Sequence, residues 1–171
     1  LIVLQAIALH LKLPETYFDK KVTGGNSILR AIHYPPIETE PKGAVRAAAH
    51  GDINLITILM GASAKGLEIQ TRNGDWIKVT ALPNQVVINI GDMMSRLTNN
   101  TLHSSIHQVI NPQKKDWKKP RFSIPFFMHP RSEMSLNCLE SCVSKAYPKK
   151  YTDITAGDFL EERIKELGLK K

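Results

Sequence analysis

The fold is decided by the stretch Ala47–Met60, which reads AAAHGDINLITILM. It ends in an apolar run, Ile53–Met60, of the kind that forms buried strands. Ahead of that run stand His50, Gly51 and Asp52. Side chains two positions apart on a strand point to the same side, so His50 and Asp52 can face one ion while Gly51 turns away. We therefore expect a β-rich domain with a metal site on one of its strands.

A third ligand is expected from a distant strand. His107 lies within residues 104–111, which read as another strand. Two imidazoles and one carboxylate can hold a divalent iron on one face and leave the opposite face open. The sequence thus predicts an iron site made of His50, Asp52 and His107. His103 has the same strand parity as His107 and stays open as an alternative ligand.

Arg121 and Ser123 open a further predicted strand, Arg121–Met128. Their spacing puts both side chains on one face of that strand. A guanidinium presents a fork of hydrogen-bond donors that matches a carboxylate, and a neighbouring hydroxyl can add one more. We expect these two residues to bind the carboxylate of an acidic co-substrate.

The remaining sequence predicts short antiparallel strands between two helical ends. Leu1–Leu11 is an apolar helix, and Thr155-Ala156-Gly157-Asp158 is a capping pattern that starts a C-terminal helix. Asn73-Gly74 is a strong hairpin signal. The expected strands are residues 27–34, 53–60, 67–71, 76–80, 85–90, 104–111 and 121–128. Such a series indicates a mainly β sandwich or barrel. We expect one domain over residues 1–171, with helical flanks at 1–26 and 155–171.

Composition agrees with a single folded core. The chain has 171 residues, of which 42% are hydrophobic, and that is enough to bury one core.

The net charge is +7. Part of this charge surrounds Trp117, at Lys114, Lys115, Lys118 and Lys119. Basic residues around an aromatic can bind nucleic acid. The segment lies between two prolines, where a solvated loop is expected, so we favour a loop over a nucleic-acid site.

The two cysteines bear on the cellular compartment. Cys138 and Cys142 lie four residues apart, with no other Cys or His at zinc-finger spacing. We expect free thiols in a reducing cytosol, and hence a cytoplasmic protein.

The apolar segment Leu1–Leu13 is too short to span a bilayer and contains His10 and Lys12, so no membrane partner is expected.

Several segments in this order resemble the C-terminal half of the isopenicillin N synthase-like, non-haem iron(II) and 2-oxoglutarate-dependent dioxygenases. The resembling segments are Tyr34-Pro35-Pro36, His50-Gly51-Asp52, Gly66–Gln70, Gly74-Asp75-Trp76, Val87–Asp92, Ser105–Val109, Arg121–Phe127, Leu13–Phe18 and Tyr151–Gly157. Members of this family are usually longer and carry a further N-terminal region. We therefore expect this chain, which does not begin with Met, to be a fragment without that region.

The resemblance implies a double-stranded β-helix, or jelly roll, with flanking helices. It implies iron(II) as cofactor, 2-oxoglutarate and O2 as co-substrates, and oxidation of a small organic molecule by hydroxylation or a related C–H oxidation. The far carboxylate of 2-oxoglutarate would meet Arg121 and Ser123, and Tyr34 would donate a further hydrogen bond. The family's Ser-Ile-His-Gln-Val segment favours His107 as the third iron ligand.

Two positions depart from the family pattern, and two alternatives stay open. The middle residue of the His-x-Asp triplet is commonly Thr, whereas here it is Gly51, and an Asn that helps hold the co-substrate in many plant members is replaced by Ile32. Isopenicillin N synthase and aminocyclopropane carboxylate oxidase share the pattern without 2-oxoglutarate. A 2-oxoglutarate-independent iron oxidase is therefore one alternative. A nucleic-acid-binding or repair module is the other, although dealkylating members carry a second Arg where this chain has Phe127.

Overall fold

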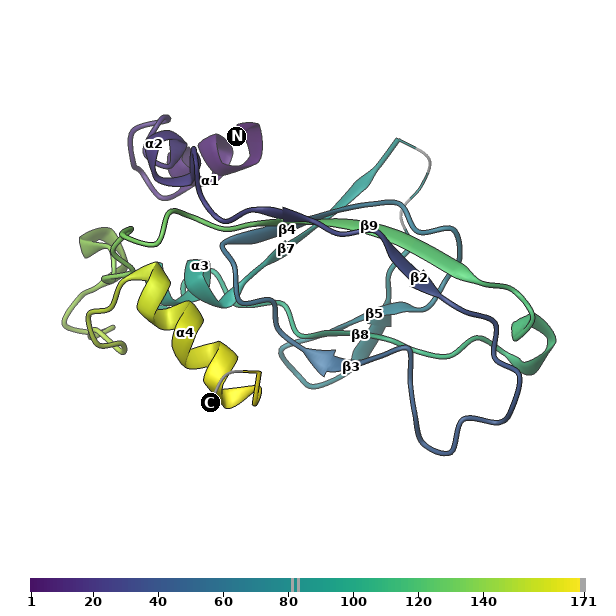
Figure 1. Cartoon of the computed structure of the whole chain (residues 1–171). Helices are drawn as coiled ribbons and strands as arrows, with labels where there is room; N and C mark the ends of the chain where they lie inside the picture. Colours follow the sequence, from purple (N-terminus) through teal and green to yellow (C-terminus); the bar gives the residue numbers. More distant parts are fainter. Residues whose placement is uncertain (81, 83, 170–171) are drawn as a thin grey trace.

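The larger of two antiparallel sheets is built around its longest strand, β9 (Arg121–Met128), in a computed structural model that describes residues 1–80, 82 and 84–169 (Figure 1). One edge of β9 pairs with β1 (Ile28–Leu29) and β2 (Ile32–Tyr34), and the other pairs with β4 (Ile56–Met60). Strand β4 pairs in turn with β7 (Val86–Ile90). The expected strand over residues 27–34 is thus present as two short strands that pair with β9.

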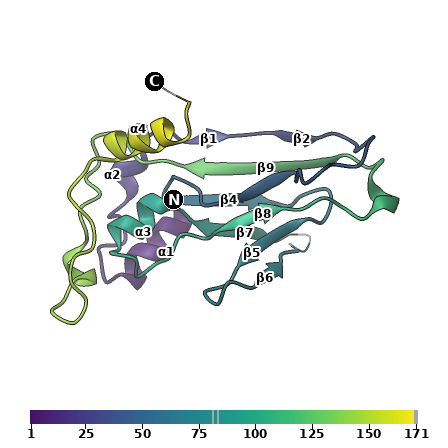
Figure 2. The ribbon, with the colours of Figure 1, turned by 90° about the horizontal axis from the view of Figure 1, so that it is seen from below.

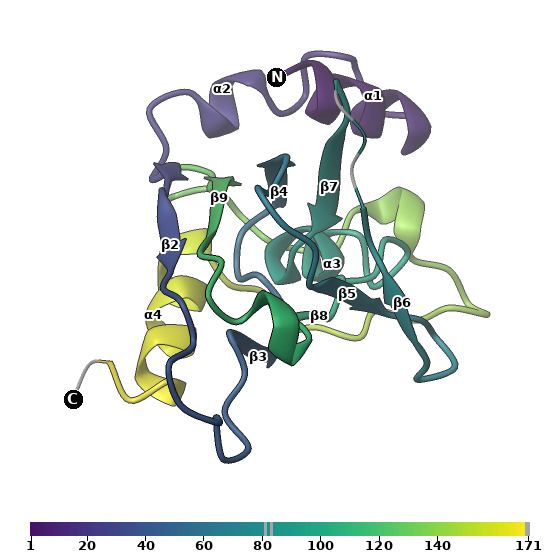
Figure 3. The same ribbon diagram turned by 90° about the vertical axis from the view of Figure 1, so that its right-hand side faces the viewer.

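The smaller sheet contains the strands that carry the histidines. Its order is β3 (Ala47–His50), β8 (His107–Val109), β5 (Leu67–Gln70) and β6 (Trp76–Lys78), all antiparallel. The predicted hairpin at Asn73-Gly74 joins β5 to β6. From β3 to β9 the chain passes repeatedly from one sheet to the other, and the two sheets face each other (Figure 3). This is the jelly roll that the family resemblance implies, and it agrees with the mainly β sandwich or barrel predicted from the strand pattern.

Strand register decides which side chains point between the sheets. Across the β4–β7 pair, Thr57 lies opposite Asn89 and Leu59 lies opposite Val87. Leu59 and Val87 line a cavity together with Leu67 of the smaller sheet. Residues with the parity of Thr57 and Leu59 therefore form the inner face of the larger sheet.

Helices cover one end of the larger sheet. Helix α1 (Ile2–His10) and helix α2 (Asp19–Val22) lie on its outer side, and α4 (Ala156–Glu166) lies on the other (Figures 1 and 2). The main core joins them to the sheet through Leu4, Ala8, Phe18, Leu55, Ile56, Met128 and Phe159. As the capping pattern predicts, Thr155 Oγ1 accepts a hydrogen bond from the Asp158 amide. Residues 170–171 of the expected C-terminal flank lie outside the described residues. Within the described part of the chain, none of the helices is long and apolar enough to cross a bilayer.

Helix α3 (Asp92–Leu97) is not among the elements that the sequence predicts. It has six residues, and no side chain caps its first turn. Such a short helix has little stability of its own and depends on tertiary packing. Its Met93, Met94 and Leu97 are buried in the main core. The helix therefore exists because the fold provides a place for its apolar side chains.

Candidate active site

The two predicted histidine ligands lie directly opposite each other in the smaller sheet. His50 ends β3, His107 begins β8, and the antiparallel register pairs them. Their ring centroids are 4.4 Å apart. Each ring hydrogen-bonds through Nδ1 to a backbone carbonyl two residues earlier, that of Ala48 at 2.7 Å and that of Ser105 at 3.0 Å. An Nδ1–H that donates to a carbonyl leaves Nε2 with a free lone pair, as a metal ligand requires.

Asp52 completes the cluster. Its Oδ1 lies 3.9 Å from Nε2 of His50 and 3.9 Å from Nε2 of His107. The three ligand atoms all lie within 4.8 Å of one another, close enough for one ion to reach them all. Asp52 and His107 are buried, whereas the His50 side chain is 48% exposed. Two neutral imidazoles and one carboxylate on one side of the ion are the donor set of a non-haem iron(II) site.

The position of Asp52 corrects one expectation about the strand. Strand β3 ends at His50 and β4 begins only at Ile56, so Asp52 lies between two strands and strand parity does not place it. Instead, its backbone carbonyl accepts a hydrogen bond of 2.7 Å from the amide of Asp92, the first residue of α3. Thr57 Oγ1 donates to its Oδ2 at 2.6 Å. The unexpected helix thus helps to place the carboxylate.

His103, the alternative ligand, lies outside the cluster. It precedes β8 by four residues in an irregular segment, so it shares no strand face with His107. Its exposed ring meets Arg72 Nη2 at 3.4 Å. Among the residues that the structure describes, the only group of metal-ligating side chains is His50, Asp52 and His107.

Arg121 brings a buried positive charge to the inner face of β9. Its side chain is 1% exposed, and it donates to the Ala64 carbonyl at 3.2 Å and to Ser123 Oγ at 3.3 Å. Its Cζ lies 5.1 Å from the ring centre of Tyr34, which faces it across the β2–β9 pair. In the described part of the chain, no carboxylate is within ion-pair distance of this guanidinium. Burial lowers the pKa of Arg121, yet a guanidinium stays charged, so the site is suited to an anion.

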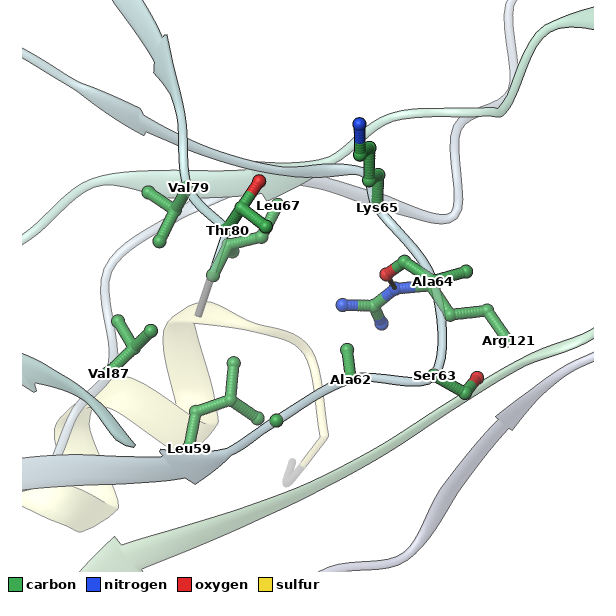
Figure 4. A pocket seen from close by; sticks show the side chains of 11 residues that line it. Leu59, Ala62, Ser63, Ala64, Lys65, Leu67, Val79, Thr80, Val87 and Arg121 are labelled. Carbon is green, nitrogen blue, oxygen red and sulfur yellow. Dashed lines mark hydrogen bonds between the residues drawn. The ribbon is translucent and has the colours of Figure 1, made fainter. Parts of the chain in front are cut away.

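The guanidinium points into a cavity between the sheets (Figure 4). The cavity has a volume of about 230 Å³. Leu59, Leu67, Val79 and Val87 form its apolar part. The metal-ligand candidates are not in its lining, but His50 and His107 lie on the smaller sheet, which supplies Leu67 of the lining. The arrangement can therefore accept an acid whose carboxylate meets Arg121 in an otherwise apolar space.

The two departures from the family pattern have local explanations. Ile32 lies opposite Ser123 across the β2–β9 pair, so an apolar side chain stands beside the hydroxyl there. A Cβ on Gly51 would lie 2.9 Å from Ser104 Oγ and 3.1 Å from Asp92 Oδ1. These two side chains occupy the space that a larger residue would need.

The apolar side chains on the outer face of the larger sheet do not reach the cavity. Ile88 of β7 and Ile124 of β9 alternate with the inner-face residues and are 42% and 41% exposed. They belong to the outer face of the sheet.

The lysine-rich segment around Trp117 is the solvated loop that the sequence predicts, with an ion pair of 2.8 Å between Lys119 and Asp116. The indole N–H of Trp117 donates to the Pro112 carbonyl, so the ring is held against the loop itself.

Comparison with known proteins agrees with this site. The profile of the 2OG-Fe(II) oxygenase superfamily matches residues 25–130. The chain belongs to this superfamily. The predicted cofactor and co-substrate, iron(II) and 2-oxoglutarate, are those that the superfamily is named for.

The similarity to individual proteins covers nearly the whole chain, beyond the residues that the profile matches. The 2-oxoglutarate-Fe(II) type oxidoreductase hxnY of Emericella nidulans is 33% identical over 167 residues, which cover 96% of this chain and 47% of the relative. A 2OG-Fe(II) oxygenase family protein from Caulobacter crescentus has a TM-score of 0.89 and 47% identity, over 96% of this chain and 53% of that one. A full-length protein from Neurospora crassa, in complex with alpha-KG, has a TM-score of 0.87 and 34% identity, over 96% and 52%. The chain thus spans about half the length of the curated relatives it matches.

Sequence reasoning missed the groups that support the ligands. These are Thr57, which binds Asp52, the Ala64 carbonyl, which binds Arg121, and the first residue of α3. Thr57 had a visible signal, because it is the one hydroxyl residue in the apolar run Ile56–Met60. The Ala64 carbonyl had none, because every residue carries a backbone carbonyl.

Proposed function

We propose that the protein to which this chain belongs is an iron(II)- and 2-oxoglutarate-dependent oxygenase that oxidises a small organic molecule by hydroxylation or a related C–H oxidation. One observation carries the proposal. A buried guanidinium without a carboxylate partner in the described part of the chain faces a cavity between the two sheets, and one of these sheets carries His50 and His107 of a His-Asp-His cluster. A metal site alone would fit many reactions, whereas the added anion site fits a 2-oxo dicarboxylic acid.

In this proposal His50, Asp52 and His107 hold the iron. Bound iron(II) supplies the chelation of the 2-oxo acid and the activation of oxygen. Arg121 and Ser123 bind the far carboxylate of 2-oxoglutarate and fix its orientation. Tyr34 lies opposite Arg121 and donates a further hydrogen bond to the co-substrate. Leu59 and Val87 exclude water from the region between the iron-chelating end and the far carboxylate of the co-substrate.

The alternatives receive less support. A 2-oxoglutarate-independent oxidase would use the same iron ligands, but several similar proteins carry 2-oxoglutarate in their names or bind alpha-KG in their structures. A nucleic-acid module would use the lysine-rich loop, but Phe127 stands where dealkylating members carry a second Arg, and the N–H of Trp117 is already bound to the Pro112 carbonyl. Structures of the Neurospora crassa protein contain thymine or 5-formyluracil, and a JOX2 structure contains JA, so these similar structures hold different small molecules. A small-molecule substrate is accordingly part of the proposal.

We also propose that the protein acts in the cytoplasm and that residues 1–171 form one domain of a longer enzyme. The support for the first point is the pair of free thiols, Cys138 and Cys142. The support for the second is the shared core that joins α1 and α4 to the larger sheet, together with the greater length of the relatives. In a longer enzyme, residues outside this chain would contribute to the substrate pocket.

The test is an anaerobic titration of the full-length protein with iron(II) and then 2-oxoglutarate. We expect a visible metal-to-ligand charge-transfer band when the co-substrate chelates the iron. Asp52→Ala should abolish the band by removing the anionic ligand. Iron binding without any band on addition of 2-oxoglutarate would contradict the proposal and favour the oxidase.

A further inference from the structure

The two oxygens of the Asp52 carboxylate have different surroundings. Oδ1 faces the two imidazoles, at 3.9 Å from each Nε2. Oδ2 accepts a hydrogen bond of 2.6 Å from the Thr57 hydroxyl. Since both side chains are almost fully buried, water does not compete for this bond. One carboxylate oxygen is therefore engaged before any metal binds.

A third residue supports this hydrogen bond. Asn54 Nδ2 donates to Thr57 Oγ1 at 3.0 Å. The hydroxyl proton is then free to point at an acceptor, and the choice lies between Asp52 Oδ2 at 2.6 Å and Asn54 Oδ1 at 3.4 Å. A short bond to a charged oxygen is the stronger of the two. The amide, the hydroxyl and the carboxylate form a chain that ends on the ligand.

The middle of this chain is rigidly placed. Thr57 lies on the central strand β4, opposite Asn89 on one side and Phe127 on the other. A β-branched side chain in a strand has few alternative rotamers. Asn54 is held as well, because its backbone carbonyl accepts a hydrogen bond of 3.2 Å from the amide of Met93 in α3. The hydroxyl therefore holds the carboxylate in a fixed position relative to the sheet.

We propose that Thr57 is a positioning residue for the metal centre. By holding Oδ2 it makes Asp52 present Oδ1 alone, so that the carboxylate binds through one oxygen and the remaining positions stay available for the co-substrate and oxygen. This inference rests on the proposed function, because it takes His50, Asp52 and His107 as iron ligands. Thr57 itself touches neither the ion nor the substrate.

The test compares Thr57→Val with Thr57→Ser in the full-length protein. The first change keeps the shape and removes the hydroxyl, and the second keeps the hydroxyl. The affinities for iron(II) and cobalt(II) and the visible spectrum of the cobalt form are measured without turnover. We expect Thr57→Val to weaken metal binding about 10- to 100-fold, the range found for partners of metal ligands. Its cobalt spectrum should also change, since the freed carboxylate can bind through both oxygens. Thr57→Ser should resemble the wild type in both respects.

Two controls separate this role from general stability and from the proposed function. Thr98→Val removes a buried hydroxyl that donates to the Met94 carbonyl at 2.9 Å, so it should lower the melting temperature and leave the cobalt spectrum unchanged. Asp52→Ala tests the site itself. If Asp52→Ala keeps its iron, the proposed function fails. If Asp52→Ala loses iron while Thr57→Val binds cobalt with wild-type affinity and spectrum, only the role of Thr57 is overturned.

Thr57→Ala serves the same comparison if Thr57→Val does not fold. It also lacks the hydroxyl and leaves room around the carboxylate. Failure of Thr57→Ser to restore the wild-type spectrum would equally overturn the inference, because the hydroxyl would then not be the feature that matters.

Discussion

At the scale of single residues, the unusual feature is the buried charge of Arg121. Its guanidinium donates to the neutral oxygens of Ala64 and Ser123. Burying a cation without an anion is costly, and a protein keeps such a charge where a ligand completes the pair. The residue is therefore better explained by ligand binding than by stability.

Arg121→Ala is expected to weaken 2-oxoglutarate binding strongly and to leave iron binding nearly intact. Removing one partner of a buried charge pair costs about 2–5 kcal/mol, which corresponds to a loss of about 30-fold or more in affinity. Arg121→Lys should recover part of the loss, because it keeps the charge but not the fork. Equilibrium titration of the iron-loaded protein with 2-oxoglutarate measures both effects.

The matched control is Arg46→Ala. Arg46 also lies near Tyr34, with its Cζ 5.9 Å from the ring centre, but it does not line the Arg121 cavity. Its loss should change the affinity for 2-oxoglutarate much less. Normal binding by Arg121→Ala, or an equal loss in both variants, would contradict the role of Arg121.

At the scale of elements, the junction between β7 and α3 positions the carboxylate ligand. Gly91 lies between the strand and the helix and packs directly on Asn54. A Cβ there would lie 2.2 Å from the Asn54 carbonyl oxygen, which is part of the backbone and cannot turn aside. The absence of a side chain at this position lets α3 approach the segment that carries Asp52.

Gly91→Ala should therefore lower both stability and metal affinity. Overpacking of this kind costs about 1–3 kcal/mol, and the displaced Asn54 would no longer support Thr57. Thermal unfolding and iron titration give the two readouts. Gly61→Ala is the stability control, because a Cβ there has no neighbour within 4 Å among the described residues. Equal melting temperatures for the two variants would show that the close packing at Gly91 does not matter.

At the scale of the whole molecule, the outer face of the larger sheet is only partly covered. Val3 and Ile7 of α1, and Ile58 and Ile90 of the sheet, pack against the main core. The rest of the outer face exposes a group of large apolar side chains, namely Leu29, Met60, Val86, Ile88, Phe122 and Ile124. A contiguous apolar surface of this kind favours association with other apolar surfaces.

Residues 1–171 in isolation are accordingly expected to bind an apolar fluorescent dye and to self-associate at high concentration. The double change Ile88→Thr and Ile124→Thr should reduce both effects and leave iron affinity unchanged, since these side chains point away from the metal centre. Leu167→Gln is the control, because it removes an exposed leucine outside this face. Dye fluorescence and light scattering are the measurements. A monomer that binds no dye would contradict the expectation.

The sequence by itself determined the parts that depend on local patterns. An apolar run located β4, a strand pattern located β9, turn residues located the hairpin at Asn73-Gly74, and the capping pattern located α4. Residue chemistry, together with a family resemblance, selected the ligand types.

Only the tertiary structure decided how these parts meet. Both faces of β4 are apolar, so alternation could not say which side is inside, and pairing with β7 and β9 settled it. The family resemblance had already favoured His107 over His103, but only strand pairing set His107 opposite His50, and only contacts with α3 and Thr57 placed Asp52. The physical reason is the same in each case. These positions depend on hydrogen bonds and packing between segments far apart in the chain, and such contacts leave no periodic signal in the sequence.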